Sequence, residues 1–123
     1  MAQPTRRLPQ RIVIPVNPAE LGYLAGIIDG EGSIFRNGHH PQRPRWILDV
    51  ANTDWSLIEW LLSLGGTCSE ANRPPRRTVY HWKVCSRADV EALLTAIEPL
   101  LRIKRGRARE CLDELLALEL APA

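Results

Sequence analysis

The ten residues LAGIIDGEGS, at positions 24 to 33, constrain the fold of this chain more than any other segment. The apolar run contains Ala25 and Gly26, whose small size suits very close contact between two helices. It leads directly into Asp29 and Glu31, which are separated and followed by glycines. Carboxylates at the C-terminal end of a helix are unfavourable beside the negative end of the helix dipole, unless a cation is present. By itself, an Asp-x-Glu sequence also suits a capping or surface pair.

The residues before this segment predict where its helix begins. Asn17 suits the N-cap, Pro18 the first helical position, and Glu20 lies three residues after the cap, as a capping box requires. Gly30 and Gly32 are predicted to end the helix. We therefore expect a helix that begins at residue 18 and delivers both acids at its far end.

The remaining periodicities predict two strand pairs, each followed by a helix. Strands are expected over residues 33–37, 43–52, 67–72 and 78–86. One helix is expected from residue 53 or 54 to the stop at Gly65 and Gly66, and another from Ser86 or Arg87 to a break at Pro99. A last helix is expected to place Leu112, Leu115, Leu116 and Leu118 on its apolar side. The order predicts an α+β fold in which helices cover one face of a twisted antiparallel sheet. Alternation assigns one set of strand residues to the core, namely Trp46, Leu48, Val50, Tyr80, Trp82 and Val84.

Arginines are concentrated in the two predicted strand pairs. Three arginines and no acid lie between Gly32 and Leu48, and four arginines with one lysine and no acid lie between Ala71 and Ala88. A net charge of +2 conceals this distribution. Such runs are often solvated surface, but arginine pairs bidentately with phosphates and guanine edges. The pattern favours a nucleic-acid partner, with the uncovered sheet face in a DNA major groove.

The bulk properties limit the other classes of protein. A length of 123 residues suits one domain. No apolar run approaches the roughly 20 residues of a membrane span, so we expect no membrane partner and an intracellular location, in a bacterial cytoplasm or an organelle, without secretion. Cys68, Cys85 and Cys111 match neither a disulfide framework nor a zinc motif, and are expected to be reduced and partly buried.

The segment LAGIIDGEGS closely resembles the signature of the LAGLIDADG homing endonucleases. The predicted order of elements extends the resemblance over residues 17 to 118. It implies the αββαββα fold, a four-stranded saddle for DNA and a single endonuclease domain over residues 17–120. The Pro- and Arg-rich residues 1–16 lie outside the resemblance and are expected to form an N-terminal arm. Because the chain holds one copy of the motif, the resemblance also implies a homodimer in which two motif helices pack together, through Leu24, Ala25, Gly26, Ile28 and Asp29.

The resemblance also implies site residues. Glu31 matches the catalytic metal ligand, Gly30 supplies the preceding backbone carbonyl, and Asp29 matches an acid that is usually structural. Asn52 matches a polar residue of the water network and Lys104 a basic pocket residue. Asn52 also suits a cap of the following helix, and Lys104 also suits a phosphate contact or a solvated helix start.

The resemblance therefore implies a sequence-specific endonuclease of the intron-homing type that makes a double-strand break by hydrolysis with Mg²⁺. Mn²⁺ is expected to substitute, and Ca²⁺ to bind without turnover. The expected target is long, partly palindromic double-stranded DNA. Base and phosphate contacts are assigned to Ser33, Phe35, Asn37, Arg43, Arg45, Ile47, Asp49, Arg73, Arg76, Arg77, His81 and Lys83.

Two alternatives stay open at this point. The first is a non-cleaving nucleic-acid-binding protein of the same fold, either an intron splicing maturase that binds RNA or a DNA-binding regulator. The second is a protein-only dimerisation domain, which would leave the acid-free arginine-rich segments without a role.

Overall fold

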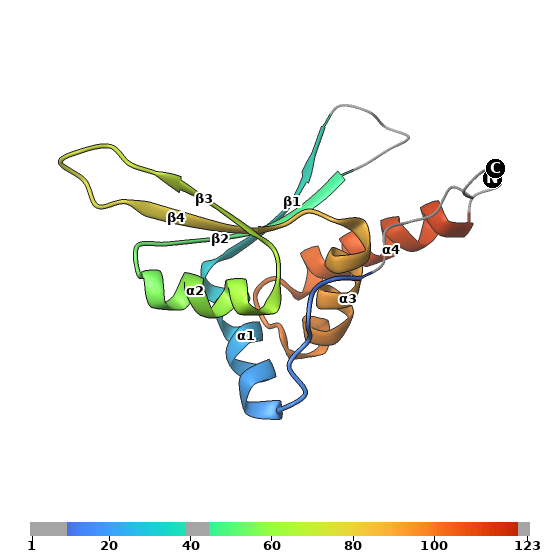
Figure 1. The fold of residues 1–123 in the computed structure, drawn as a ribbon. Coiled ribbons are helices and arrows are strands. Elements are labelled where there is room, and N and C mark those ends of the chain that lie inside the picture. Colours follow the sequence, from blue (N-terminus) through green and yellow to red (C-terminus); the bar gives the residue numbers. More distant parts are fainter. Residues whose placement is uncertain (1–9, 39–44, 121–123) are drawn as a thin grey trace, which may run out of the picture.

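The computed structural model of this chain describes residues 10–38 and 45–120. Figure 1 shows two strand pairs above a layer of helices. The elements follow the predicted order: α1 (Pro18–Glu31), β1 (Gly32–Asn37), β2 (Arg45–Asn52), α2 (Trp55–Leu64), β3 (Thr67–Ala71), β4 (Val79–Val84), α3 (Arg87–Ile97), the 3₁₀ turn η1 (Glu98–Leu100) and α4 (Arg105–Leu120).

The strands form one antiparallel sheet in the order β1-β2-β4-β3. Helices α1 and α3 pack against β2, and α2 packs against β3 and β4. Figure 1 shows all the helices on one side of the sheet, while the β3–β4 hairpin extends beyond them. The predicted α+β fold, with one sheet face covered by helices, is therefore confirmed.

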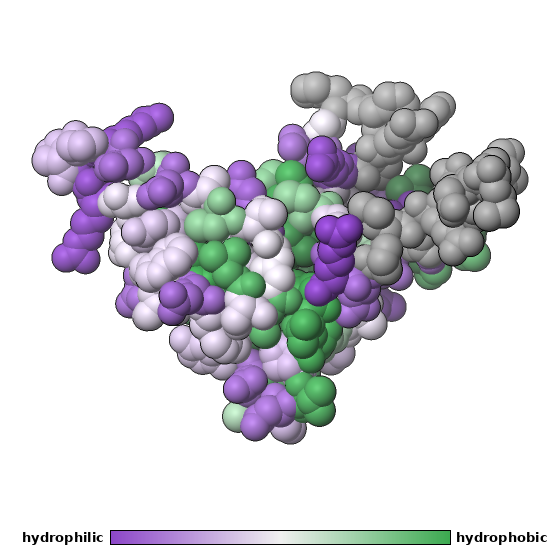
Figure 2. All heavy atoms as spheres, viewed as in Figure 1, coloured by the Kyte–Doolittle hydropathy of each residue, from purple (hydrophilic) through white to green (hydrophobic). Residues whose placement is uncertain are grey.

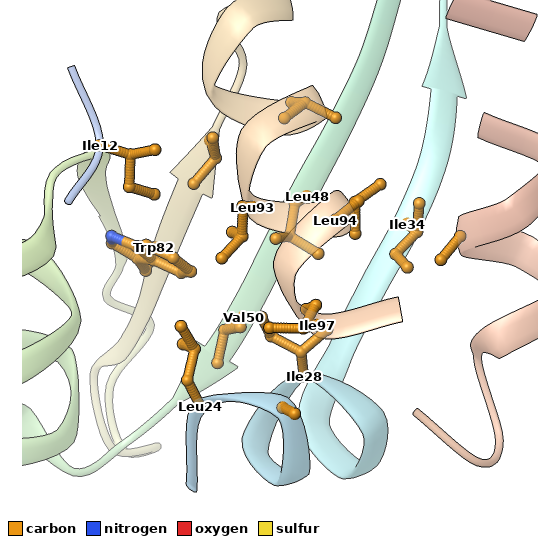
Figure 3. Close-up of a cluster of buried hydrophobic side chains, with 14 of the residues drawn as sticks. Ile12, Leu24, Ile28, Ile34, Leu48, Val50, Trp82, Leu93, Leu94 and Ile97 are labelled. Atoms are coloured by element: carbon orange, nitrogen blue, oxygen red, sulfur yellow. The ribbon is translucent and has the colours of Figure 1, made fainter. Parts of the chain in front are cut away.

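The hydrophobic core lies between the sheet and the helices. In Figure 3, Leu48, Val50 and Trp82 from the sheet point toward Leu24 of α1 and Leu93 of α3. All five are fully buried, and each such side chain contributes roughly 1.5–3 kcal/mol relative to an exposed position. The predicted core set of the strands is confirmed, except that Tyr80 is only partly buried.

Side-chain caps begin helices α1, α2 and α3. Asn17 Oδ1 accepts from the amide of Ala19 at 2.8 Å, Asp54 Oδ1 from the amide of Ser56 at 2.9 Å, and Ser86 Oγ from the amide of Asp89 at 3.4 Å. The predicted helix starts are therefore confirmed. The predicted end of the first helix was partly wrong, because α1 continues through Gly30 to Glu31; Gly32 is its C-cap, as predicted.

Two glycines are required by close approaches. Gly32 has an ordinary extended backbone, but a Cβ built on it would lie 2.7 Å from the carbonyl oxygen of Ile28. Gly66 has φ +77°, and its Cβ would lie 2.6 Å from Trp82 Nε1. The neighbouring Gly65 carbonyl accepts from that indole at 2.8 Å. The turn after α2 therefore fits closely around Trp82, the largest fully buried side chain.

The residues before α1 are tied to the core. The amides of Arg11 and Ile12 donate to Asp89 Oδ1 at 2.7 and 3.0 Å, and the amide of Val13 donates to the Leu64 carbonyl at 2.7 Å. Ile12 is 3% exposed and lies beside Trp82 in Figure 3. Of the predicted arm, residues 10–16 are described and residues 1–9 lie outside the described residues.

The buried side of helix α4 differs in part from the predicted leucines. Its buried residues are Ala108, Cys111 and Leu115, whereas Leu116 is 53% exposed. Burial raises the pKa of the Cys111 thiol to about 12. All three cysteines are free, but Cys68 is exposed, so its predicted partial burial was wrong. No helix in the described part of the chain combines the length and apolar character needed to cross a bilayer.

Candidate nucleic-acid interface

The uncovered sheet face carries the side chains that alternation assigns to it. Strand pairing places Ser33 opposite Asp49 and Asn37 opposite Arg45 between β1 and β2, and Asp49 opposite Lys83 between β2 and β4. No described helix covers this face. We call the described outward-facing residues of the four strands the open face: Ser33, Phe35, Asn37, Arg45, Ile47, Asp49, Ala51, Thr67, Ser69, Ala71, Val79, His81 and Lys83.

Not every predicted DNA contact is equally available on this face. Arg45 and Asn37 are exposed, whereas Ile47 is only 7% exposed and offers little surface to a ligand. Arg43 lies outside the described residues. Arg36 lies on the helix side, where its Nη2 is 3.0 Å from Glu114 Oε1 of α4.

Arginines occupy the far end of the β3–β4 hairpin. Arg73, Arg76 and Arg77 are exposed and line a shallow hollow with His81. The amide of Arg76 donates to the Arg73 carbonyl at 2.9 Å, which closes the turn. Figure 2 shows this end of the hairpin as strongly hydrophilic. The hairpin therefore carries positive charge beyond the helices that support the sheet. Basic side chains in such a position are able to contact the phosphates of a nucleic-acid backbone.

One acid lies among the described residues of the open face, and it is paired. Asp49 Oδ1 is 3.1 Å from His81 Nδ1, and Asp49 Oδ2 is 3.9 Å from Lys83 Nζ. The Asp49 side chain is 14% exposed, against 34% for His81. The carboxylate is therefore largely enclosed by its two neighbours.

Glu31 ends α1 at the point where the chain enters the sheet. The residue is exposed, and its carboxylate makes no hydrogen bond or ion pair with the described residues. Gly32, the next residue, pairs with Val50 in β2. This carboxylate is thus fixed at the junction of α1 and the sheet, with its oxygens available to a ligand.

Asp29 holds two segments of the chain together, which agrees with the structural role that the resemblance to the LAGLIDADG signature implied for it. Its carboxylate accepts from the amides of Arg102, Ile103 and Lys104 at 3.0, 2.8 and 2.9 Å. These bonds, led by that from Lys104, hold the pKa of Asp29 below its ordinary value. Asp29 therefore fastens the end of α1 to the segment that begins α4.

Lys104 lies at the same end of α1 as Glu31. Its Nζ donates to the backbone carbonyl of Asp29 at 2.5 Å, and the residue is partly buried. A lysine here neutralises the negative end of the helix dipole. Lys104 is thus held at the end of the motif helix through the Asp29 carbonyl, and its role as a basic pocket residue stays a prediction.

Asn52 is the last residue of β2. Alternation along β2 places it on the helix side with Leu48 and Val50, and it lines a hollow with Tyr23 and Trp60. Its Oδ1 accepts from the amide of Asp54 at 2.8 Å, just before α2. Asn52 therefore supports the turn that leads to the Asp54 cap of α2, and its catalytic role stays a prediction.

The predicted dimer contacts need correction. Leu24 and Ile28 are fully buried and Ala25 is 2% exposed, all within the core of this chain, so these side chains are not free to meet a partner. Gly26, which was also predicted, does lie on the exposed side of α1, together with Gly22 and Gly30; an added Cβ at each would meet no atom within 4 Å. The signal was in the sequence as glycines at intervals of four, which share one helix face.

Helices α1 and α2 also expose aromatic side chains near these glycines. Tyr23 is 59% exposed and stacks edge-on against Trp60, with ring centroids 5.3 Å apart. Trp55 is 44% exposed and contacts Tyr80 at 5.1 Å. Both tryptophans therefore pack at the edge of α2.

No group of three or more histidine, cysteine or acidic side chains that could hold a metal ion occurs in the described ranges 10–38 and 45–120. A metal at Glu31 would therefore need ligands other than such side chains of one protomer, for example a backbone carbonyl, a second chain, waters or a phosphate.

No sequence-family model matches this chain, and no curated protein matches it by sequence. Solved structures do match its fold. The homing endonuclease I-CvuI, in complex with the I-CreI target, is 18% identical with a TM-score of 0.64, and the match covers 83% of this chain and 69% of that chain.

Two further matches are similar. An archaeal intron-encoded homing endonuclease, I-Vdi141I, complexed with DNA, is 17% identical with a TM-score of 0.65, and the match covers 80% of this chain and 67% of that chain. The meganuclease I-SmaMI, bound to uncleavable DNA, is 17% identical with a TM-score of 0.60, and the match covers 80% of this chain but 37% of that chain. The chain therefore has the LAGLIDADG homing endonuclease fold that its motif predicted.

Proposed function

We propose that this chain is a homodimeric, sequence-specific DNA endonuclease that hydrolyses one phosphodiester in each strand with the help of a divalent metal. The observation that carries the proposal is the position of Glu31. Its carboxylate is exposed and free of described partners at the end of α1, where α1 enters the sheet that carries the open face. A duplex on the open face would bring its backbone toward this acid.

The residues at the end of α1 fit a hard divalent cation. Glu31 provides carboxylate oxygens, and Gly30 provides a carbonyl in the last turn of the helix, where carbonyls lack helical partners. Mg²⁺ prefers such oxygen ligands together with waters and phosphate oxygens. When bound there, the metal would activate water and neutralise charge on the leaving oxygen. Mn²⁺ would substitute, and Ca²⁺ would support binding without turnover.

Lys104 supplies positive charge beside this acid. Its Nζ is held on the Asp29 carbonyl, and Asp29 in turn holds the amides at the start of α4. We assign to Lys104 the neutralisation of phosphate charge that develops during cleavage. Asp29 is a positioning residue, because it fixes the segment that carries Lys104 and touches no reacting atom.

A second copy of the chain is needed to cut both strands, since one protomer contributes one Glu31. The glycine side of α1, formed by Gly22, Gly26 and Gly30, suits close packing of two helices because no side chain stands between their backbones. Packing about a twofold axis would bring the two Glu31 residues near each other and join the two sheets into one saddle. The expected target is therefore partly palindromic.

The open face supports DNA as the substrate. An antiparallel pair of strands has the width to enter the major groove, and Arg45, His81 and Lys83 are directed to this side. Arg73, Arg76 and Arg77 extend the charge outward to the flanking phosphates. Base edges would be read on the sheet and phosphates held at the hairpin end.

The test is to replace Glu31 with Gln and to measure binding and cleavage of a selected target in parallel. Because Gln keeps the shape but loses the charge that binds metal, we expect DNA binding to persist while Mg²⁺-dependent cleavage falls by at least about a hundredfold. Glu59→Gln, which removes an exposed acid from α2, is the matched control. Undiminished cleavage by Glu31→Gln would contradict the assignment. Tight binding with no cleavage by the natural chain would favour the non-cleaving alternative.

A further inference from the structure

The Asp49–His81 pair is built differently from the rest of the open face. Asp49 is the acid among its described residues, and a carboxylate there repels DNA phosphates. Its side chain is 14% exposed, so it offers little surface to a base. Such a residue costs binding energy unless it acts on a neighbour.

The neighbour on which it acts is His81. His81 lies diagonally across the β2–β4 pair from Asp49, since it pairs directly with Ala51. Its Nδ1 is 3.1 and 3.3 Å from the two carboxylate oxygens of Asp49. The other charged group at the pair is Lys83 of β4, 3.9 Å from Asp49 Oδ2, and β3 presents Ser69 opposite the histidine.

The contact fixes which ring nitrogen carries the proton. A carboxylate only accepts hydrogen bonds, so the neutral ring must donate from Nδ1, and Nε2 then keeps its lone pair. Nε2 has no partner among the described residues. His81 is also more exposed than Asp49, at 34%. The pair therefore offers a single oriented acceptor to whatever lies on the sheet.

We propose that Asp49 is a positioning residue that holds His81 as an Nδ1–H tautomer, and that His81 Nε2 reads an exocyclic amino group in the major groove. Only adenine N6 and cytosine N4 present such a donor there, whereas guanine and thymine present acceptors. The target thus carries an amino-bearing base at the position facing His81. This inference rests on the proposed function, because it requires a duplex on the open face.

The test uses the full chain and a randomised duplex library, selected in Ca²⁺ at a pH of about 8, where free imidazole side chains are neutral. One hydrogen bond corresponds to about a fivefold preference for adenine or cytosine over guanine or thymine at one position of each half-site. Asp49→Ala should abolish that preference, and Asp49→Asn, whose amide oxygen still accepts, should retain it. Both variants raise overall affinity alike by removing a negative charge, so affinity and preference are separable.

Two further measurements isolate the positioning role. His81→Phe should remove the same preference, and the double variant with Asp49→Ala should lose no more than either single change. Long-range proton–nitrogen correlation spectra of the free protein should show His81 protonated at Nδ1 in the natural chain and in Asp49→Asn, but not in Asp49→Ala. This readout does not depend on DNA.

The outcomes separate the two proposals. An Nε2–H tautomer in the natural chain, selection of guanine or thymine, or an unchanged preference in Asp49→Ala overturns the role of the pair and leaves the endonuclease proposal standing. Failure of the natural chain to select any sequence overturns the proposed function and this inference with it.

Discussion

The junction between α1 and β1 gives the sharpest test of the packing described above. At Gly32 an added Cβ would lie 2.7 Å from the Ile28 carbonyl oxygen, 3.0 Å from Ile28 Cα and 3.2 Å from Ile28 Cγ2. Two of these atoms are backbone, and Ile28 is fully buried, so the turn cannot yield by rotating a side chain. We predict that Gly32→Ala destabilises the chain.

The magnitude follows from two opposing terms. Overpacking of a tight site costs roughly 1–3 kcal/mol. The backbone at Gly32, with φ −85° and ψ 163°, suits alanine, which recovers about 0.4–1 kcal/mol through the smaller entropy of the unfolded chain. The net expectation is a loss of about 1–2 kcal/mol. For a domain of this size, that loss lowers the melting temperature by roughly 4–10 °C.

The assay is urea unfolding followed by circular dichroism, without DNA and at one fixed protein concentration, because association shifts apparent stability. Gly106→Ala is the control, since Gly106 lies exposed in α4 and an added Cβ there meets no atom within 4 Å. The control should be neutral or more stable by up to about 1 kcal/mol. A Gly32→Ala chain as stable as the natural one would refute the steric reasoning.

Two further predictions concern α1. Gly26→Ala should stabilise the isolated protomer by up to about 1 kcal/mol, because alanine favours an exposed helix interior, yet weaken self-association about tenfold by separating the paired helices. Sedimentation equilibrium checks the second effect, and an unchanged dissociation constant would contradict the proposed interface. Because the folded pKa of Asp29 lies below its ordinary value of 3.8, its contribution to stability is present above that pH and is lost as the pH falls through the folded pKa. Asp29→Asn should therefore make the free energy of unfolding fall less steeply as the pH is lowered below that value. The same pH dependence in the variant as in the natural chain would show that the three hydrogen bonds from backbone amides to Asp29 contribute nothing to stability.

Local sequence signals predicted most of the fold because each has a short-range cause. Asn17 and Pro18 marked the start of α1 by capping and fixed backbone geometry. The alternation of Trp46, Leu48 and Val50 identified the buried side of β2, since a strand presents its side chains to two faces in turn. Such signals require no knowledge of the partner element.

The failures arose where one residue type satisfies two environments. Leu24 and Ile28 are apolar, and apolarity alone does not distinguish the core of a protomer from a contact between protomers. Asn52 suits both a water network and the turn before α2; its contact with the Asp54 amide shows the second environment, and the first stays a prediction. In α4 the leucines exceed the positions that α3 and β1 cover, so Leu116 is left outside.

The β3 strand has a consequence for how such a chain changes over time. Every residue of β3 is exposed, and the strand is held to the sheet by its backbone pairing with β4. Substitutions at exposed positions usually alter stability by no more than about 0.5 kcal/mol. If the chain binds DNA as proposed, mutations in β3, natural or designed, could therefore change the contacts with the target while the stability of the fold is kept.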